Sequence, residues 1–376
     1  MRVLLDEADL RPRRVRGLRP DADGGILRRR ANQPPDRVAA SERQASSCLI
    51  ASAIYCGAPR KMTNRREMTI LEPSAFERRL KAIGAEVETM LESLLDAAPL
   101  GGEIMRPSRL IAAMRHGALA GGKRLRPFLT IAVAEALGVV GEGPRRAGSA
   151  IELVHCYSLI HDDLPAMDDD DLRRGRPTVH KAFDEATAIL AGDGLLTLAF
   201  DVMGDEATHA DGVIRAALCV GLARAAGVGG MAGGQMLDLE AESAAEPLGE
   251  AAIERMQAMK TGALLSFSVE AGAILAGASP ARRAALLRYG RSLGAAFQVA
   301  DDILDAEGDD KRLGKRAGKD AARNKATFVA ALGPAGAKAA RDRFVLEAEA
   351  ALDESGLGRR DDLLRAAARF VASRTS

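Results

Sequence analysis

Residues 161–175 read HDDLPAMDDDDLRRG, and this stretch constrains the fold more than any other part of the chain. It holds six carboxylates within ten residues, directly after an apolar segment. The ordinary interpretation is a solvated acidic loop, since like charges repel one another. However, Pro165 predicts that the preceding helix ends near Leu164 and that the chain then turns. On an unbroken helix, Asp162 and Asp168 would lie about 240° apart, at roughly 100° per residue. We therefore expect the turn to return Asp168 to the helix end, where it shares a cation with Asp162.

Outward from this stretch, apolar residues recur at helical spacing along most of the chain. The first stripe contains Phe76, Leu80, Ile83 and Val87, at three- and four-residue steps. No run alternates with period two, Trp is absent, and Tyr occurs three times, which argues against a β-sandwich. The sequence therefore predicts an all-α domain over residues 68–376, a single large bundle of ten or so helices. The other stripes cover residues 107–138, 145–163, 185–203, 212–227, 250–276, 281–304, 321–332, 338–352 and 360–373.

Residues 1–67 have a different composition, with 14 Arg and 1 Lys against 8 acidic residues. Their Arg clusters alternate with Pro, Gly and Asp without periodicity, which predicts a disordered Arg-rich extension. A nucleic-acid-binding arm, a transit peptide and an unselected segment upstream of a true start at Met62 or Met68 all stay open. The whole chain has a formal net charge of only +1, so we expect no nucleic acid as a partner.

The cysteine spacing and the apolar runs indicate the compartment. The four cysteines have neither zinc-site nor disulfide-scaffold spacing, which fits a reducing environment. No apolar run reaches the roughly 18–20 residues needed to cross a bilayer. The apolar segment between Cys48 and Cys56 lies too far from the N-terminus for a signal peptide. We therefore expect a cytoplasmic protein without stable membrane insertion.

A second acidic cluster, QVADDILD at residues 298–305, also follows an apolar segment. Asp301 and Asp305 lie four residues apart on one helical face, which destabilises an isolated helix unless a cation lies between them. Carboxylate ligands beside room for phosphates favour Mg²⁺. An EF-hand does not fit, because residues 162–171 lack its alternating ligands, its central Gly and its closing Glu. Two such clusters in one all-α chain predict a magnesium site.

Basic residues lie near both clusters. GGKRLRP at residues 121–127 has Lys123 and Arg126 at a glycine-rich helix start, where amides, dipole and cations suit a diphosphate. Taken alone, this pattern is more often a solvated turn, and it lacks the spacing of a Walker A loop. Arg173 and Arg174 follow the first cluster and can hold phosphate oxygens or simply relieve repulsion.

Isolated polar residues also interrupt otherwise apolar segments. His155 lies two turns before the first cluster, Gln235 and Asp238 lie one turn apart, and Lys260-Thr261 interrupts another stripe. Each of them alone is more often a cap or a paired core residue. Together they would add acids, bases and neutral oxygens to an apolar interior.

This ordered set of motifs resembles the trans-isoprenyl diphosphate synthases, and HCYSLIHDD at residues 155–163 resembles the bacterial farnesyl diphosphate synthases. The resemblance runs from about residue 70 to near the C-terminus. It implies the isoprenoid synthase fold, with a polyprenyl synthetase domain over residues 68–376 around a central cavity, and a homodimer. It also implies Mg²⁺-dependent head-to-tail condensation of isopentenyl diphosphate with dimethylallyl or geranyl diphosphate, giving (2E,6E)-farnesyl diphosphate in isoprenoid biosynthesis.

The resemblance further implies a role for each residue that matches a family motif. The metal ligands would be Asp162, Asp163, Asp168, Asp301, Asp302 and Asp305, supported by Asp238 and Gln235. Arg173 would hold the allylic diphosphate, and the isopentenyl diphosphate would be held by Lys123, Arg126, His155 and Arg174. The residues flanking the reacting carbon and the departing diphosphate would be Lys260, Thr261, Gln298 and Lys315.

Product length depends on the wall of the tail pocket. Tyr157 lies five residues before Asp162, about 7.5 Å deeper along the helix, and Ser158 lies one turn before Asp162. Tyr157 either packs between helices or, as the resemblance implies, limits growth together with Pro165-Ala166. Farnesyl diphosphate is the expected product, with geranylgeranyl or geranyl diphosphate as alternatives.

Two other function classes compete with this interpretation. A terpene cyclase shares the all-α fold, but it normally has Asn and Ser in its second metal motif and has no use for Lys123 and Arg126. A non-catalytic regulatory subunit would have lost acids from one cluster, whereas both clusters are intact here.

Overall fold

The computed structural model describes residues 73–244, 246, 248–307 and 326–373, all within the unit Arg66–Ser376. The predictions for residues 1–67 and for Lys315 fall outside these described residues. The all-α prediction is confirmed, because helices make up nearly all of the described chain. The helices are α1 (Pro73–Leu94), α2 (Ser108–Ala118), α3 (Leu125–Ala136), α4 (Glu142–Asp162), α5 (Val179–Ala182), α6 (Glu185–Gly204), α7 (Gly212–Ala226), α8 (Met231–Glu242), α9 (Glu250–Gln257), the π-helical turn η1 (Ala258–Gly262), α10 (Ala263–Leu275), α11 (Pro280–Glu307), α14 (Phe328–Ser355), the 3₁₀ turn η2 (Gly358–Asp361) and α15 (Asp362–Ala372).

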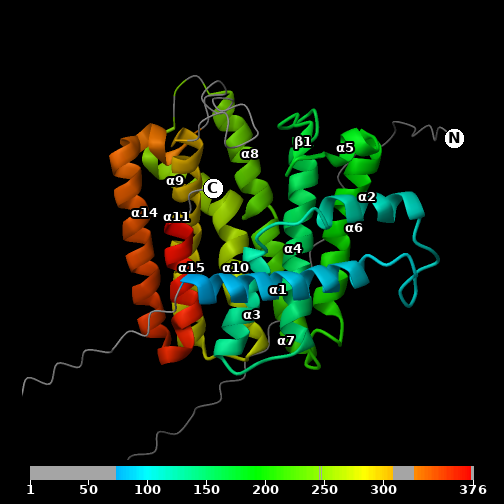
Figure 1. Ribbon diagram of the computed structural model, residues 1–376, viewed down its shortest axis with the longest axis horizontal. Coiled ribbons are helices and arrows are strands. Elements are labelled where there is room, and N and C mark those ends of the chain that lie inside the picture. The colour runs from blue at the N-terminus through cyan, green and yellow to red at the C-terminus, as the bar shows by residue number, and fades with distance from the viewer. Residues whose placement is uncertain (1–72, 245, 247, 308–325, 374–376) are drawn as a thin grey trace, which may run out of the picture. The chain divides into compact units, whose positions relative to one another are not determined.

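Helix α10 is buried at the centre of the bundle. It contacts α3, α4, α7 and α11, and almost all of its side chains are buried. In Figure 1 the helices α4, α6, α10, α11 and α14 stand roughly side by side, and α1 crosses the others. A helix that is apolar on every side, as α10 is, can only be stable inside such a bundle.

Glycines let α11 lie unusually close to η1 and α10. A Cβ added at Gly294 would lie 3.0 Å from the Cα of Gly262, and one at Gly290 would lie 2.9 Å from the Cα of Ser266. No larger residue fits at this seam without moving the backbone. The seam therefore fixes α11, which ends in the second acidic cluster, against η1.

One short hairpin interrupts the helical pattern. Strands β1 (Leu172–Arg173) and β2 (Arg176–Pro177) pair antiparallel, and they are the only strands in the described part of the chain. The loop residues Arg174 and Gly175 have φ of 53° and 74°, as a two-residue hairpin turn of the primed type requires. The sequence pattern does not predict this hairpin, because two-residue strands are too short to show a period of two.

Two helical segments are long and apolar enough to cross a membrane when judged by length and composition alone. They are Glu185–Gly204, which is α6, and Gly212–Glu242, which spans α7 and α8. This differs from the expectation that no segment reaches that length. Core helices of soluble proteins pass the same test, and α6 contacts α2, α4, α5 and α7 within the bundle.

Candidate active site

The first acidic cluster folds back onto the end of α4, as Pro165 predicted. The amide of Asp168 donates to the carbonyl of Asp162 at 2.8 Å, and the amide of Asp170 donates to the carbonyl of Asp163 at 3.2 Å. Between them, Asp169 adopts the left-handed conformation with φ of 51°, which Asp tolerates better than most residues. The predicted turn is therefore confirmed, and it brings the backbone of Asp168 against that of Asp162.

The carboxylates of this cluster lie in unequal surroundings. Asp163 is only 3% exposed and accepts from Arg173, whose Nε and Nη2 lie 2.7 and 2.6 Å from its Oδ1. Burial raises the pKa of Asp162 to about 6, and the nearby Asp168 and Asp163 carboxylates add to this rise, while Lys260 and Arg173 oppose it. A carboxylate with a raised pKa beside others lacks enough positive charge, and a divalent cation would supply it.

The second cluster lies at the C-terminal end of α11. Asp301 is half-buried and Asp305 is exposed, whereas Asp302 is only 5% exposed. The Oδ1 of Asp302 accepts from Nε2 of Gln298, and its Oδ2 accepts from the amide of Phe328, both at 2.8 Å. Burial raises the pKa of Asp302 to about 6 against these two hydrogen bonds, with Asp305 and Asp301 adding to the rise.

The π-helical turn η1 carries the two predicted residues between the clusters. Lys260 makes an ion pair with Asp238 of α8, and Oγ1 of Thr261 donates to Oε1 of Gln298 at 2.8 Å. Helix α8 lies directly on this turn, because a Cβ added at Gly234 would lie 2.1 Å from the Lys260 amide nitrogen. Single π-turns within α-helices occur frequently at functional sites. Gln235, the remaining predicted residue of α8, is half-buried.

The basic loop before α3 and the hairpin meet at a third part of the site. Arg174 donates to the carbonyl of Gly121, and its guanidinium lies where a Cβ at Gly122 would be. The buried Nε of Arg126 makes no hydrogen bond within the described residues. Burial lowers the pKa of Arg126, and Arg174 adds to this, while Glu152 and Asp301 oppose it. An unsatisfied guanidinium donor beside a second Arg is suited to an anion.

Two further predicted residues border this basic region. Burial, reinforced by Arg126 and Arg174, holds the pKa of His155 well below its usual value, so the imidazole is neutral among cations. Lys123 is exposed, and its Nζ lies 5.9 Å from the centre of the Phe370 ring in α15. Together with the preceding contacts, this brings α3, α4, the hairpin and α15 around one electropositive region.

Arg124 is a residue that sequence reasoning missed. It is 3% exposed and adopts φ of 48° at the start of α3. Its guanidinium donates to Glu152 and Glu88 at 2.8 Å each and to the carbonyl of Ala118 at 2.7 Å. These bonds tie the basic loop to α1, α2 and α4. A glutamate at position 152 inside an apolar helical stripe was the only signal that a buried cation lay opposite.

Both residues predicted to limit product length lie on α4, and Ser158, one turn before Asp162, shares its face of the helix. Tyr157 is half-buried, and its ring meets that of His161 edge to face at 5.7 Å. Burial raises the pKa of Tyr157, and the nearby Asp162 adds to the rise. The hydroxyl of Ser158 donates to the carbonyl of His155 on its own helix.

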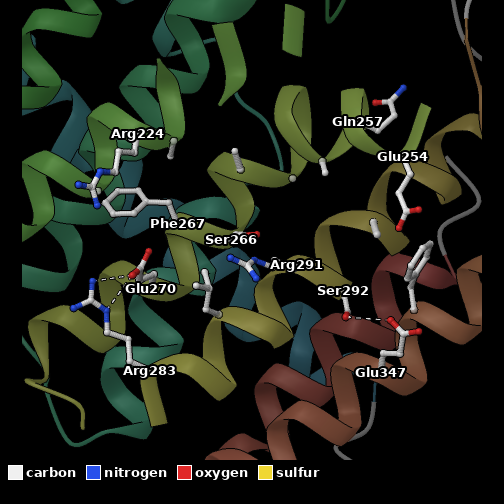
Figure 2. Close-up of a pocket in the computed structure, with 18 of the residues that line it drawn as sticks. Arg224, Glu254, Gln257, Ser266, Phe267, Glu270, Arg283, Arg291, Ser292 and Glu347 are labelled. Carbon is white, nitrogen blue, oxygen red and sulfur yellow. Dashed lines mark hydrogen bonds and ion pairs between the residues drawn. The ribbon is translucent and has the colours of Figure 1, made fainter. Parts of the chain in front are cut away.

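A separate cavity of about 700 Å³ lies behind the η1 turn, between α7, α9, α10, α11 and α14. None of the predicted site residues lines it, although Gly262, the residue after Thr261, does. Figure 2 shows the ion pair between Arg283 and Glu270 at one side of this cavity, with Phe267 nearby. The cavity is thus distinct from the acidic clusters.

The donor set fits a metal ion, although within the described residues no three Asp, Glu, His or Cys side chains already converge at metal-binding distance. The observation that supports the fit is that the turn after α4 returns the backbone of Asp168 to that of Asp162, while α11 carries a second set of carboxylates. Oxygen donors alone, from carboxylates on two helix ends, are the set that Mg²⁺ prefers.

Comparisons with known proteins agree with this geometry. A family model described as polyprenyl synthetase matches residues 107–355. The chain is 50% identical over 229 residues to the farnesyl diphosphate synthase of Escherichia coli (strain K12), a match that covers 60% of this chain and 75% of that protein. It is 44% identical over 269 residues to the farnesyl diphosphate synthase of Bacillus subtilis (strain 168), covering 71% of this chain and 90% of that protein. A solved apo structure of an FPP/GFPP synthase from Zymomonas mobilis matches with a TM-score of 0.71 at 40% identity, covering 80% of this chain and 100% of that one.

Proposed function

Because the chain belongs to the polyprenyl synthetase family, we propose how its residues carry out the reaction of that family. The chain is a prenyltransferase of the bacterial farnesyl diphosphate synthase type, which the relatives at 50% and 44% identity support. Its reaction joins isopentenyl diphosphate to dimethylallyl or geranyl diphosphate, head to tail, and the end product is (2E,6E)-farnesyl diphosphate.

The allylic diphosphate would bind between the two acidic clusters. Asp162, Asp168, Asp301 and Asp305 would hold Mg²⁺, and Arg173 would contact the diphosphate. Two predicted ligands, Asp163 and Asp302, are almost fully buried and make internal bonds. Asp163 fixes the guanidinium of Arg173 by a charge-assisted pair of hydrogen bonds. Asp238 and Gln235 would support the metals from α8.

Isopentenyl diphosphate would bind in the electropositive region beside α3. The unsatisfied Nε of Arg126 supports this assignment. So does Arg174, which lies against the glycine loop. Lys123 would contribute a third cation. The lowered pKa of His155 favours a neutral imidazole, which would donate one hydrogen bond without adding charge. Lys315, outside the described residues, would contact the departing diphosphate.

The condensation itself needs charge stabilisation more than a protein base. Bound Mg²⁺ supplies positive charge for the diphosphate that leaves with the C–O bonding electrons. Lys260 would add a positive charge near the departing diphosphate. The side-chain oxygens of Thr261 and Gln298 would stabilise the allylic carbocation. The double bond of isopentenyl diphosphate then attacks that carbon, and a proton leaves, taken up by the departed diphosphate. Apolar helix walls keep water from the cation.

The quaternary state and compartment also belong to this proposal. Adjacent helices α6 and α7 carry exposed apolar side chains, with Ile189 at 45%, Leu190 at 57% and Val213 at 75% exposure. Exposed apolar side chains of this kind are typical of a surface that a partner covers. A second copy of the chain would cover it, giving a homodimer. We expect this dimer in the cytoplasm, without membrane insertion and without a nucleic-acid partner.

The observation that carries the proposal is that two aspartate-rich helix ends flank the paired Lys260–Asp238 and Thr261–Gln298 contacts. The test is product analysis with Mg²⁺, labelled isopentenyl diphosphate and either dimethylallyl or geranyl diphosphate. Farnesol after dephosphorylation, lost in Asp162→Ala, is the expected result. Geranylgeraniol or geraniol from the wild-type chain would replace the product assignment. No condensation would contradict the proposed reaction altogether.

A further inference from the structure

Three hydrogen bonds of 2.8 Å join the η1 turn, through two residues of α11, to the start of α14. Thr261 Oγ1 donates to Gln298 Oε1, Gln298 Nε2 donates to Asp302 Oδ1, and the amide of Phe328 donates to Asp302 Oδ2. Asp302 is therefore bonded through both of its oxygens, at an exposure of only 5%. Its neighbours Asp301 and Asp305 are more exposed, at the end of the same helix.

The order of these bonds fixes which way the dipoles point. An ionised carboxylate only accepts hydrogen bonds, so Asp302 obliges the amide of Gln298 to turn its Nε2 toward it. The carbonyl oxygen of Gln298 must then face Thr261, whose single hydroxyl hydrogen is used in that bond. The remaining lone pairs of the Thr261 hydroxyl are consequently left to accept from, or point at, another group. Hydrogen-bonded chains of this kind strengthen each member by polarisation.

We propose that Asp302 is a positioning residue that sets the polarity of Thr261 and Gln298 toward the allylic carbocation, and that it is not a metal ligand. The inference rests on the proposed prenyl transfer. It differs from the expectation, drawn from the family motif, that all three acids of the second cluster bind Mg²⁺. A fixed negative oxygen dipole, held in place before the cation forms, stabilises that cation without reorganisation.

The hydrogen bond from the Phe328 amide also gives Asp302 a structural role. Phe328 is the first residue of α14, so the same carboxylate fixes the start of that helix. Gly294, on the same helix as Asp302, lets α11 pack closely against η1. The Asp302 carboxylate therefore holds Gln298 and the start of α14 directly, and it holds Thr261 through Gln298.

The test compares two isosteric variants, Asp302→Asn and Asp301→Asn. In Asp302→Asn the new amide keeps an oxygen for Phe328 but turns an N–H toward Gln298, so the Gln298 amide flips and Thr261 must accept instead of donate. We expect kcat to fall about 100-fold, the scale of losing one preorganised electrostatic contact. The Mg²⁺ concentration for half-saturation should stay within twofold. In Asp301→Asn that concentration should rise.

A swap variant tests the polarity directly. In Gln298→Glu combined with Asp302→Asn, the new carboxylate accepts from Thr261 and from the Asn amide, while the Asn oxygen accepts from Phe328. All three hydrogen bonds are restored with the original direction at Thr261. We expect kcat at least about tenfold above that of Asp302→Asn alone, one bond's share of the lost stabilisation. A swap no better than the single variant would overturn the proposal.

A binding measurement without turnover separates this inference from the proposed reaction. Calorimetry with Mg²⁺ and a non-hydrolysable thiolo analogue of the allylic diphosphate should give equal affinity for wild type and Asp302→Asn, and weaker binding for Asp301→Asn. If Asp302→Asn loses binding as Asp301→Asn does, Asp302 is a metal ligand and the inference fails. If wild type binds the analogue but condenses nothing, the proposed reaction fails instead. Unchanged melting temperatures exclude unfolding as the cause, and an unstable Asp302→Asn is replaced by the swap variant in the same comparison.

Discussion

We propose that Tyr157 limits product length through the size of its ring. The side chain is half-buried on α4, five residues before Asp162, and its pKa is raised by burial and by Asp162. We expect Tyr157→Ala to extend the product by at least one five-carbon unit, because the space the ring leaves is open to the growing tail. Tyr157→Phe keeps the ring and should keep farnesol. Reversed-phase separation of the alcohols distinguishes these outcomes. An unchanged product from Tyr157→Ala would mean that another residue limits product length.

His155 stays neutral near pH 6 in the absence of substrates. Its pKa is lowered by burial first, and then by Arg126, Arg174, Arg124 and Arg173. Below the unfolded pKa of about 6.5, the unfolded chain binds a proton that the folded chain does not. The free energy of unfolding therefore falls as the pH is lowered through 6.5.

Urea titrations at pH 7.5 and pH 5.5 check this expectation. The loss of stability toward pH 5.5 should be smaller in His155→Gln than in the wild type, because Gln cannot be protonated. NMR of labelled histidine at pH 6 should find the His155 ring uncharged. A protonated His155 ring at that pH would contradict the lowered pKa that burial and the four nearby Arg side chains give this residue.

At the scale of elements, the basic loop depends on a buried cation. Arg124→Met would leave Glu152 buried without its partner, which typically costs about 3–5 kcal/mol of unfolding free energy. The KM for isopentenyl diphosphate should rise as well, since the loop that carries Lys123 is no longer tied to α4. Replacing both partners, as Arg124→Met with Glu152→Leu, should recover most of the stability but not the KM. Chemical denaturation and steady-state kinetics measure the two effects, and a double variant no more stable than the single one would contradict the pairing.

The π-turn η1 has a close neighbour in α8. Gly234→Ala would put a methyl group on the backbone of Lys260 and should cost about 1–3 kcal/mol, as overpacking does. Activity should fall further than stability, because the displaced turn carries Lys260 and Thr261. Gly229→Ala is the matched control, since nothing lies within 4 Å of its added Cβ, and we expect a change within about 0.5 kcal/mol. Equal activity in both variants would mean that the turn tolerates displacement.

Some of these elements could be predicted from sequence and others could not. Proline acts locally, so Pro165 was enough to predict the end of α4 and the return of Asp168. The hairpin at Arg174 and the π-turn at Lys260 depend on tertiary packing, which leaves no periodicity to read. The inward bonding of Asp302 was also hidden, because its partner Phe328 lies 26 residues away.

At the scale of the whole molecule, the exposed apolar side chains of α6 and α7 support the proposed homodimer. Leu190→Glu would put a charge in the proposed interface, so sedimentation velocity should find a monomer. The melting temperature at high dilution should stay close to that of wild type, because Leu190 is not part of the core. Leu346→Glu changes an equally exposed residue on α14 and should leave the sedimentation coefficient unchanged. Dimers that persist in Leu190→Glu would locate the interface on another face.

The hairpin of β1 and β2 has a consequence for the whole catalytic cycle. Arg173 reaches Asp163, and the next residue, Arg174, reaches the Gly121 loop. The two residues proposed to bind separate substrates are thus consecutive in the chain. Covalent bonds, not side-chain packing, set their spacing, so it does not stretch when the bundle loosens with heat or mutation. Core substitutions should therefore unfold this protein before they alter the spacing of the residues proposed to bind its two substrates.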